Sequence, residues 1–255
     1  MSERNIKLVI AYDGTDFCGW QKQDNGRTIQ ESIETALEKL HKHPVRLTGA
    51  GRTDTGVHSI GQVANFYTDI QTIPPERFAP ALNSILSQDI RILSSEETTG
   101  DFHARFDARS RTYQYHIITG RNALPHERRY HLCLRSRPSI ARLNALARLL
   151  HGEMDCSTFA SPKNPNESRY RYIYSAGFFI QNNYLVFEIT ANAFLWKMVR
   201  SIVGTLLFYE EKGILPTEFT AVINSFDRTK AGPVAPAHGL FLHRVDYPPN
   251  SFSAP

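Results

Sequence analysis

The sequence predicts an α+β protein built of two tandem β-α-β-β-α-β subdomains, each a ferredoxin-like antiparallel sheet backed by helices. Two observations predict this class. Segments with the two-residue alternation of strands are interspersed with amphipathic segments of helical period. The same order of strands and helices occurs twice along 255 residues, although the residues themselves do not repeat. A chain of this length can bury the cores of two small domains.

The first half of the chain is expected to form four strands and two helices. Its clearest signal is the pair Thr28 and Glu31, a capping-box pattern that precedes apolar residues at helical spacing. Pro75 opens the second helix, because proline is favoured in the first helical turn. The expected elements are, in order, a strand over residues 6–12, a helix over 29–40, strands over 45–48 and 60–67, a helix over 75–86 and a strand over 90–93.

The second half repeats this order. Ser139 is expected to cap a helix that ends at Gly152. Asn182 and Asn183 separate two alternating segments and predict a hairpin. The expected elements are a strand over residues 112–118, a helix over 140–150, strands over 170–180 and 184–190, helices over 195–209 and 216–226, and a last strand over 240–247.

These elements assign an N-terminal subdomain to residues 1–105 and a C-terminal subdomain to residues 106–247, followed by a disordered tail over 248–255. Residues 160–166, with two prolines, are expected to form a loop. Two such sheets that abut would form a groove of a kind that suits a nucleic-acid stem.

Composition narrows the class of protein. No apolar run approaches the roughly 18–20 residues of a membrane span, and the N-terminus lacks a signal-peptide pattern, so we expect a cytoplasmic protein without membrane contact. The three cysteines are isolated and indicate neither a disulfide framework nor a zinc ribbon. A metal site could instead be built from His58, His103 or His116 together with carboxylates, but we expect no metal site.

The charge is mildly positive, with a net value of +4 and a sequence pI of about 9.0. Ten arginines lie within the segment 105–148, interleaved with tyrosine and phenylalanine. Arginine beside aromatic side chains suits contact with phosphates and stacking on bases. A solvated surface above core aromatics explains the same pattern, and the pattern alone does not choose between them.

One glycine-rich bend, residues 49–59, carries Asp54 between two expected strands. An aspartate in such a bend usually hydrogen-bonds its own backbone. The same bend also carries Arg52, a cation two residues before the carboxylate. A structural turn and a reactive site both remain open from these residues alone.

Several blocks of sequence resemble, in the same order along the chain, the tRNA pseudouridine synthases of the TruA type. The block Gly-Arg-Thr-Asp-Thr-Gly-Val-His-Ser at 51–59 is similar to the active-site motif of that family. The further blocks are Tyr-Asp-Gly at 12–14 with Gly-Trp-Gln at 19–21, Asp-Phe-His-Ala-Arg-Phe at 101–106, Arg-Thr-Tyr-Gln-Tyr at 111–115, Asn-Ala-Phe-Leu-Trp-Lys-Met-Val-Arg at 192–200, and Ala-Pro-Ala-His-Gly-Leu-Phe-Leu at 235–242. Together they span nearly the whole chain.

The resemblance implies two α/β subdomains that meet around a central basic cleft. It implies isomerisation of uridine to pseudouridine in the anticodon stem-loop of tRNA, at positions 38 to 40, by a homodimer that uses neither a metal nor an organic cofactor. Asp54 corresponds to the catalytic aspartate of the family. Whether it acts as nucleophile or as base at the sugar stays open.

The resemblance also assigns roles to other residues. Tyr113 is expected to stack on the uracil and to take part in proton transfer from C5. Arg200, a cation within an apolar helical stripe, is expected to form an ion pair with Asp54, because a charge withdrawn from water is normally paired. Arg52 is expected to hold the flipped nucleotide or enter the space it vacates. Leu240 is expected under the base, with an ordinary core position as the alternative, and Arg105 is expected to bind substrate.

Three residues depart from the family pattern. Thr55 stands where alanine is usual, Thr112 stands where a second basic residue often occurs, and Cys156 stands where an aromatic residue is common. None of these changes removes a group that the chemistry needs.

Two other functions compete with an RNA-modifying enzyme. A non-catalytic RNA-binding protein with tandem RRM-like sheets has no use for Asp54, since a carboxylate repels phosphates, and the aromatic-rich strand typical of those sheets is absent from the sequence. A metal-dependent nuclease needs clustered carboxylates, whereas no acidic residue lies closer in sequence to Asp54 on its C-terminal side than Asp69.

Overall fold

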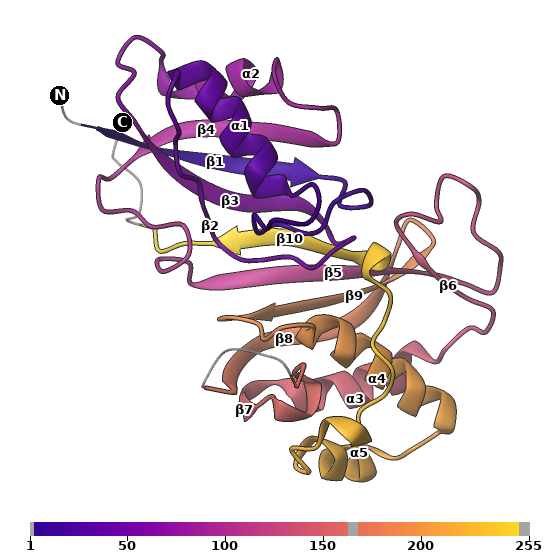
Figure 1. Ribbon diagram of the computed structural model, residues 1–255. Helices are drawn as coiled ribbons and strands as arrows, with labels where there is room; N and C mark the ends of the chain where they lie inside the picture. The colour runs from indigo at the N-terminus through magenta and orange to yellow at the C-terminus, as the bar shows by residue number, and fades with distance from the viewer. Residues whose placement is uncertain (1–2, 163–167, 250–255) are drawn as a thin grey trace. The chain divides into compact units, whose positions relative to one another are not determined.

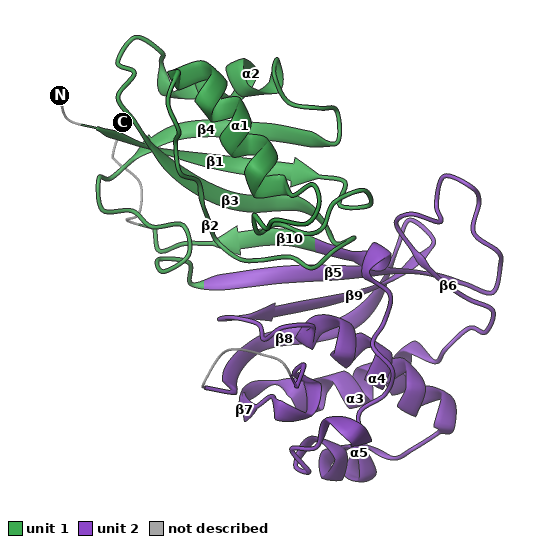
Figure 2. Cartoon of the chain, viewed as in Figure 1, with its two compact units in different colours: residues 1–109, 242–255 green, residues 110–241 purple. Residues whose placement is uncertain are grey.

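The structure is a computed structural model that describes residues 3–162 and 168–249. The described residues form a mixed α+β protein with ten strands and five α-helices (Figure 1). The chain divides into two compact units, unit 1 with residues 1–109 and 242–255 and unit 2 with residues 110–241 (Figure 2). The α+β class is therefore confirmed. Most of the loop expected over 160–166, and the tail from residue 250, lie outside the described residues.

Unit 1 has the element order β-α-β-β-α-β. Its elements are β1 (Arg4–Tyr12), α1 (Ile29–His41), β2 (Thr48–Gly49), β3 (His58–Thr68), α2 (Phe78–Asn83) and β4 (Ile90–Thr98). The last strand of the chain, β10 (Leu240–Asp246), belongs to unit 1 from Leu242 onward. The strand order is β4-β1-β3-β10, with β2 paired to β3. β1 is antiparallel to both of its neighbours.

The core of unit 1 lies between this sheet and its two helices (Figure 1). Ile6 and Leu8 of β1 are fully buried and stand opposite Phe66 and Ala64 of β3. Helix α1 begins where predicted, because the Thr28 side chain accepts a hydrogen bond from the Glu31 backbone N–H. Its buried face then packs on the sheet, so that α1 and the strands share one apolar core.

The second unit contains more elements than expected. They are β5 (Ser110–Thr119), β6 (Leu132–Leu134), α3 (Ile140–Ala147), β7 (Gly152–Asp155), β8 (Tyr170–Gln181), β9 (Tyr184–Ala191), α4 (Met198–Lys212) and α5 (Pro216–Ile223). The strand order is β5-β9-β8-β7, with β6 paired to β5. The expectation of purely antiparallel sheets is wrong at one place, because the three residues of β6 run parallel to β5.

Turn chemistry at two predicted positions is confirmed in unit 2. Asn182 and Asn183, between β8 and β9, both have positive φ angles of 49° and 68°, as a two-residue hairpin turn of type I′ requires. Gly213 ends α4 in the left-handed conformation with φ 72°. These residues position β9 and α4, which carry the buried side chains of the unit 2 core.

Three predicted helices have other bounds than expected, for local reasons: α4 is shifted toward the C-terminus, and α2 and α3 are shorter. Lys197 has φ 62°, so α4 begins at Met198 and not at Leu195. The helix expected to start at Pro75 is a 3-10 turn followed by the six residues of α2. Helix α3 ends at Ala147 with a 3-10 turn after it, and β7 forms where the predicted helix was to end.

Two further boundaries differ from expectation. The strand expected over 45–48 is the two-residue β2 at Thr48–Gly49, because the buried Val45 and Leu47 pack outside the ladder. The subdomain boundary expected after residue 105 falls at residue 109, and residues 242–247 group with unit 1 because β10 lies next to β3.

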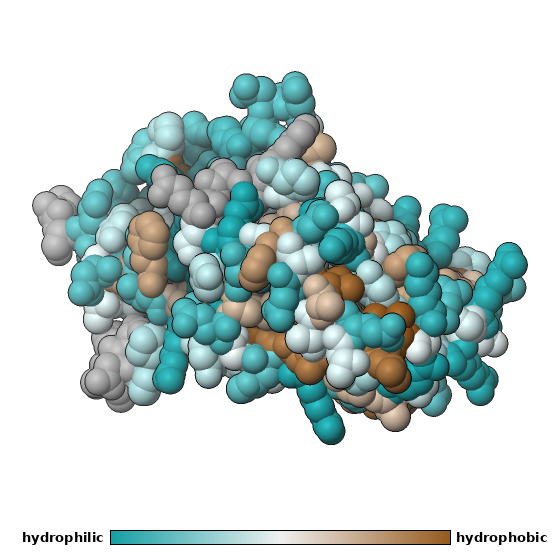
Figure 3. Space-filling view, turned by 90° about the horizontal axis from the view of Figure 1, so that it is seen from below, coloured by the Kyte–Doolittle hydropathy of each residue, from teal (hydrophilic) through white to brown (hydrophobic). Residues whose placement is uncertain are grey.

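The surface mixes hydrophilic residues with small hydrophobic patches, as the face in Figure 3 shows. Several large apolar side chains are exposed, which is ordinary for a protein surface. Among the residues that the structure describes, no helix combines the length and the apolar character needed to cross a membrane.

Candidate active site

Asp54 lies in unit 1, half-buried, in the loop that joins β2 to β3. Its backbone carbonyl accepts a hydrogen bond of 3.1 Å from the N–H of Val57, which closes a turn. Gly56 in that turn has φ 75°, a conformation that costs other residues free energy. The carboxylate therefore lies at the start of a turn whose shape depends on glycine.

Thr53, directly before Asp54, is held by two hydrogen bonds from other segments. Its Oγ1 atom lies 2.8 Å from the hydroxyl of Tyr12, at the end of β1, in a buried position. Its carbonyl accepts a hydrogen bond of 3.1 Å from the backbone N–H of Trp20. Buried hydrogen bonds of this kind restrict the backbone, so the position of Asp54 is determined by β1 and by the loop that follows it.

The loop before α1 approaches the Asp54 loop closely at Gly19. A Cβ atom built on Gly19 would lie 2.6 Å from the carbonyl oxygen of Thr53 and 3.1 Å from the carbonyl carbon of Asp54. Gly19 also has φ 92°, which disfavours any other residue. The blocks of sequence around residues 19 and 54 are thus packed backbone against backbone.

His58, where the Asp54 loop enters β3, is fully buried and contacts Asp13 and Gly14, the two residues that follow β1. The backbone N–H of Gly14 donates to His58 Nδ1 over 3.0 Å, and Asp13 Oδ1 lies 3.1 Å from the same nitrogen. The neutral ring accepts from Gly14, whereas a protonated Nδ1 would donate to Asp13. In either state the imidazole joins residues 13 and 14 to the far end of the Asp54 loop.

Arg52 is exposed and shares this loop. Its Nε donates a hydrogen bond of 3.1 Å to the side-chain oxygen of Gln21. The predicted pair Arg52 and Asp54 is therefore carried by one short segment, with the cation in solvent and the carboxylate half-buried.

Arg105, the remaining predicted residue of unit 1, lies in an exposed turn after β4. Its guanidinium carbon is 5.5 Å from the ring centroid of Phe106, which is 74% exposed. The His103 ring is 4.3 Å from the same ring. This turn offers a cation beside aromatic faces, groups that can contact phosphate and stack on bases.

Tyr113, predicted to stack on the base, lies in unit 2 on β5, opposite Ile189 of β9. It is 8% exposed, and its ring meets that of Phe194 edge-to-face at 5.1 Å. Phe194 belongs to the segment between β9 and α4. The phenol ring is therefore supported on one side by an aromatic contact that the sequence did not indicate.

Arg200 lies in the first turn of α4 between buried apolar residues. Its Nε donates to the carbonyl of Ala235 over 2.8 Å, and the Ala235 N–H donates to the Arg200 carbonyl over 3.0 Å. Burial raises the pKa of the Tyr115 hydroxyl above its ordinary value, and the charge of Arg200 opposes that shift. Arg200 is thus fixed near Tyr115 by the chain that follows α5.

Leu240 is 5% exposed at the start of β10. A Cβ atom on the preceding Gly239 would lie 2.7 Å from the ring of Tyr115, and the Tyr115 hydroxyl donates to the Pro236 carbonyl over 2.8 Å. The segment 235–240 therefore contacts both Arg200 and Tyr115. Within unit 2 the structure groups Arg200 with the residues next to Leu240, around a buried tyrosine that was not predicted.

Sequence reasoning missed the residues that hold the site. Tyr12, Trp20, His58 and Tyr115 lie inside the blocks that resembled the family, but nothing in one sequence distinguishes a positioning side chain from a core one.

The departures from the family pattern have ordinary structural positions. Thr55 is exposed, Thr112 hydrogen-bonds Thr190 across the ladder at 2.9 Å, and Cys156 is buried.

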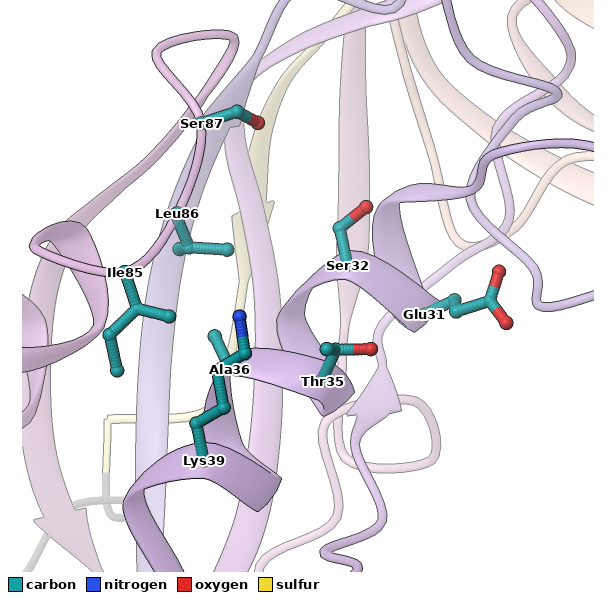
Figure 4. Close-up of a pocket in the computed structure, with 8 residues that line it drawn as sticks. All are labelled: Glu31, Ser32, Thr35, Ala36, Lys39, Ile85, Leu86 and Ser87. Atoms are coloured by element: carbon teal, nitrogen blue, oxygen red, sulfur yellow. The ribbon is translucent and has the colours of Figure 1, made fainter.

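The hollow shown in Figure 4 lies elsewhere in unit 1. It has a volume of about 250 Å³ and is lined by α1 and by the segment after α2, with none of the predicted site residues. In the described part of the chain, no group of three or more His, Cys, Asp or Glu side chains is arranged to hold a metal ion.

Comparisons with known proteins identify the family of the chain. A family model described as tRNA pseudouridine synthase matches residues 8–107 and 146–248. The chain therefore belongs to the tRNA pseudouridine synthase family, which is a family of isomerases that act in tRNA processing.

Individual relatives carry the more specific name tRNA pseudouridine synthase A. The protein of that name from Treponema denticola is 50% identical over 100% of this chain and 97% of its own length. The Treponema pallidum protein is 42% identical over 98% of this chain and 91% of its own length. The Clostridium acetobutylicum protein is 39% identical over 96% of this chain and all of its own length.

Proposed function

We propose that this chain isomerises uridine to pseudouridine in the anticodon stem-loop of tRNA, at positions 38 to 40, with Asp54 as the catalytic carboxylate. The observation that carries the proposal is the setting of Asp54. It is a half-buried carboxylate on a loop held by Tyr12, Trp20 and His58, in a chain that belongs to the tRNA pseudouridine synthase family.

The reaction breaks the bond between uracil N1 and ribose C1′, turns the base, and joins C5 to C1′. The proton on C5 is then lost and N1 gains one, so that substrate and product have the same atoms. No electron donor or acceptor is needed, and we propose that the enzyme uses no cofactor. Asp54 either attacks as a nucleophile or removes a proton at the sugar.

Residues of unit 2 complete this proposed site. Tyr113 stacks on the uracil and assists removal of the C5 proton, and Arg200 forms an ion pair with Asp54 that keeps the carboxylate ionised. Arg52 and Arg105 bind the RNA, and Leu240 packs under the base. As the resemblance to the TruA type implies, we propose that the two units act as tandem subdomains with a basic cleft between them.

The resemblance to the TruA type also implies a partner of the same kind. We infer a homodimer that works in the cytoplasm on tRNA. The alternative, a non-catalytic RNA-binding protein, is disfavoured by the detailed support given to a carboxylate that would repel phosphates.

The test is incubation of unmodified tRNA with this protein alone, followed by mass spectrometry and carbodiimide mapping of pseudouridine. The expected product is pseudouridine within positions 38 to 40, without added metal or cofactor. The Asp54→Asn variant should lose at least about a thousandfold in rate and still bind tRNA. The exposed Asp24 provides the matched control Asp24→Asn, which should retain activity. Full turnover by Asp54→Asn would exclude the catalytic role, and tRNA binding without any product would support the RNA-binding alternative.

A further inference from the structure

A chain of side-chain hydrogen bonds leads from α1 to Arg52. Arg52 Nε donates to Gln21 Oε1 over 3.1 Å, and Gln21 Nε2 donates to Gln30 Oε1 over 2.7 Å. Gln30 Nε2 donates in turn to Glu34 Oε1 over 3.0 Å. Four side chains from the 49–59 bend, the loop before α1 and α1 itself are therefore linked, and each donates to the next. We call this chain of Arg52, Gln21, Gln30 and Glu34 the relay.

The ends of this chain determine its polarity. A guanidinium can only donate hydrogen bonds, and a carboxylate without its proton can only accept them. Each of the two glutamine amides between them must present its oxygen toward Arg52 and its NH₂ group toward Glu34. The chain is complete only in that orientation.

Backbone groups impose the same orientation on Gln30. The N–H of Lys22 donates to Gln30 Oε1 over 3.2 Å, and Gln30 Nε2 donates to the carbonyl of Leu47 over 3.2 Å. If the Gln30 amide were flipped, its NH₂ group would face the N–H of Lys22 and its oxygen would face the carbonyl of Leu47. All four of its hydrogen bonds would then be lost. The orientation of Gln30 is therefore set by the main chain at both ends.

Glu34 is tied to the main chain as well, because the N–H of Leu47 donates to Glu34 Oε1 over 3.1 Å. Gln21, in contrast, is exposed, and within the described part of the chain its side chain hydrogen-bonds only Arg52 and Gln30. Its amide orientation follows from Gln30, and its free oxygen position then faces Arg52.

We propose that Gln21, Gln30 and Glu34 are positioning residues that orient the Arg52 guanidinium toward the RNA substrate. This inference rests on the proposed function in one respect, namely that Arg52 contacts RNA. With Nε engaged, rotation of the guanidinium about the side chain is limited, so its two terminal NH₂ groups are presented in one direction. A planar group held in this way binds a phosphate through two parallel hydrogen bonds at a lower entropic cost.

The relay lies at the surface, where water competes for each hydrogen bond. Gln21, Gln30 and Glu34 line a hollow of about 530 Å³ together with Lys22, Pro44, Val45 and Arg46. A single solvent-accessible hydrogen bond makes a small contribution. Loss of any one member should therefore reduce kcat/KM for tRNA by about threefold to tenfold, without unfolding the protein.

A double-mutant cycle tests the proposal. Gln30→Met removes the amide that does not itself touch Arg52, and Arg52→Ala removes the guanidinium. Gln30→Met alone should lower kcat/KM by about threefold to tenfold, and should have no further effect in the Arg52→Ala background. Gln181→Met, at the β8–β9 hairpin, is the matched control and should match the parent. Equal losses from Gln30→Met in both backgrounds would overturn the proposal.

A second measurement does not depend on activity. The Arg52 Nε–H signal in ¹⁵N-labelled protein, assigned by its loss in Arg52→Lys, should exchange with solvent faster in Gln21→Met and Gln30→Met than in the parent. Unchanged exchange would also overturn the proposal. If the parent made no pseudouridine but the exchange rates changed as expected, the proposed function would fail while the orientation of Arg52 by the relay stood.

Discussion

The hydroxyl of Tyr12 lies 2.8 Å from Thr53 Oγ1 in the interior of unit 1, one residue before Asp54. Tyr12 ends β1 and is 4% exposed, and Thr53 is 8% exposed. The last side chain of a central strand thus holds the residue that precedes the candidate catalytic carboxylate. Rigid elements place a site more accurately than a free loop does.

Removing one hydroxyl of this pair should destabilise the folded protein more than removing both. Tyr12→Phe leaves the Thr53 hydroxyl buried without that partner, and we expect a loss of about 1–3 kcal/mol in stability. Thr53→Val should cost a similar amount. The double variant should recover part of this loss, because two apolar groups of similar shape replace the pair. Thermal unfolding of the four proteins gives the coupling, and additive losses would contradict it.

Gly19→Ala should displace the Asp54 loop. The new methyl group would meet the Thr53 carbonyl at 2.6 Å in a backbone conformation that alanine disfavours, so we expect a fall of at least about tenfold in the rate of pseudouridine formation. Gly51→Ala is the control within the 49–59 bend, because nothing lies within 4 Å of a Cβ atom there. Gly51→Ala should keep parental stability by thermal unfolding. Parental turnover by Gly19→Ala would argue against a fixed loop.

The sequence predicted the elements whose signals are local. Thr28 caps α1, Gly213 ends α4 and the asparagine pair turns β8 into β9, because each residue acts on its own backbone. The short strands β6 and β7 escaped prediction. They have three and four residues, too few for an alternation to be visible, and they exist only because a neighbouring strand supplies their hydrogen bonds.

The candidate site was predicted unevenly for a similar reason. Asp54 and Arg52 were identified because their block, residues 51–59, resembles the active-site motif of the family, whereas the glycine-rich bend alone left a structural turn equally open. Tyr115 and His58 were not, because a buried tyrosine or histidine in a strand is read as core. Their contacts with Pro236 and Gly14 join residues far apart in sequence, and one sequence does not show such pairs.

The cysteines should differ in reactivity. Cys156 is fully buried, and burial raises the pKa of its thiol to about 12, so very little thiolate is present near neutral pH. Cys133 is exposed on β6. Treatment of the native protein with iodoacetamide near pH 8, followed by peptide mass spectrometry, should label Cys133 and spare Cys156 until denaturant is added. Equal labelling of both in native protein would mean that Cys156 is accessible.

Glu127 should make the stability of unit 2 depend on pH in the acidic range. Arg121 donates to both of its carboxylate oxygens at 2.6 and 2.7 Å, and the Leu124 N–H and the Tyr184 hydroxyl donate at 2.7 and 2.9 Å. These donors, Arg121 first, hold the pKa of Glu127 well below its ordinary value of 4.5. Because the folded pKa is lowered, the stabilisation is fully present above the unfolded pKa and is lost as pH falls below it.

The comparison that checks this is the thermal midpoint of the parent and of Glu127→Gln between about pH 7 and about pH 3. The parent should be the more stable protein at the upper end, and its advantage should shrink steadily below about pH 4.5. Glu153→Gln, at an exposed position on β7, supplies a control in which one carboxylate is lost without these donors. A parental advantage that stayed constant down to pH 3 would mean that the Arg121 pair does not lower the pKa of Glu127 in the folded protein.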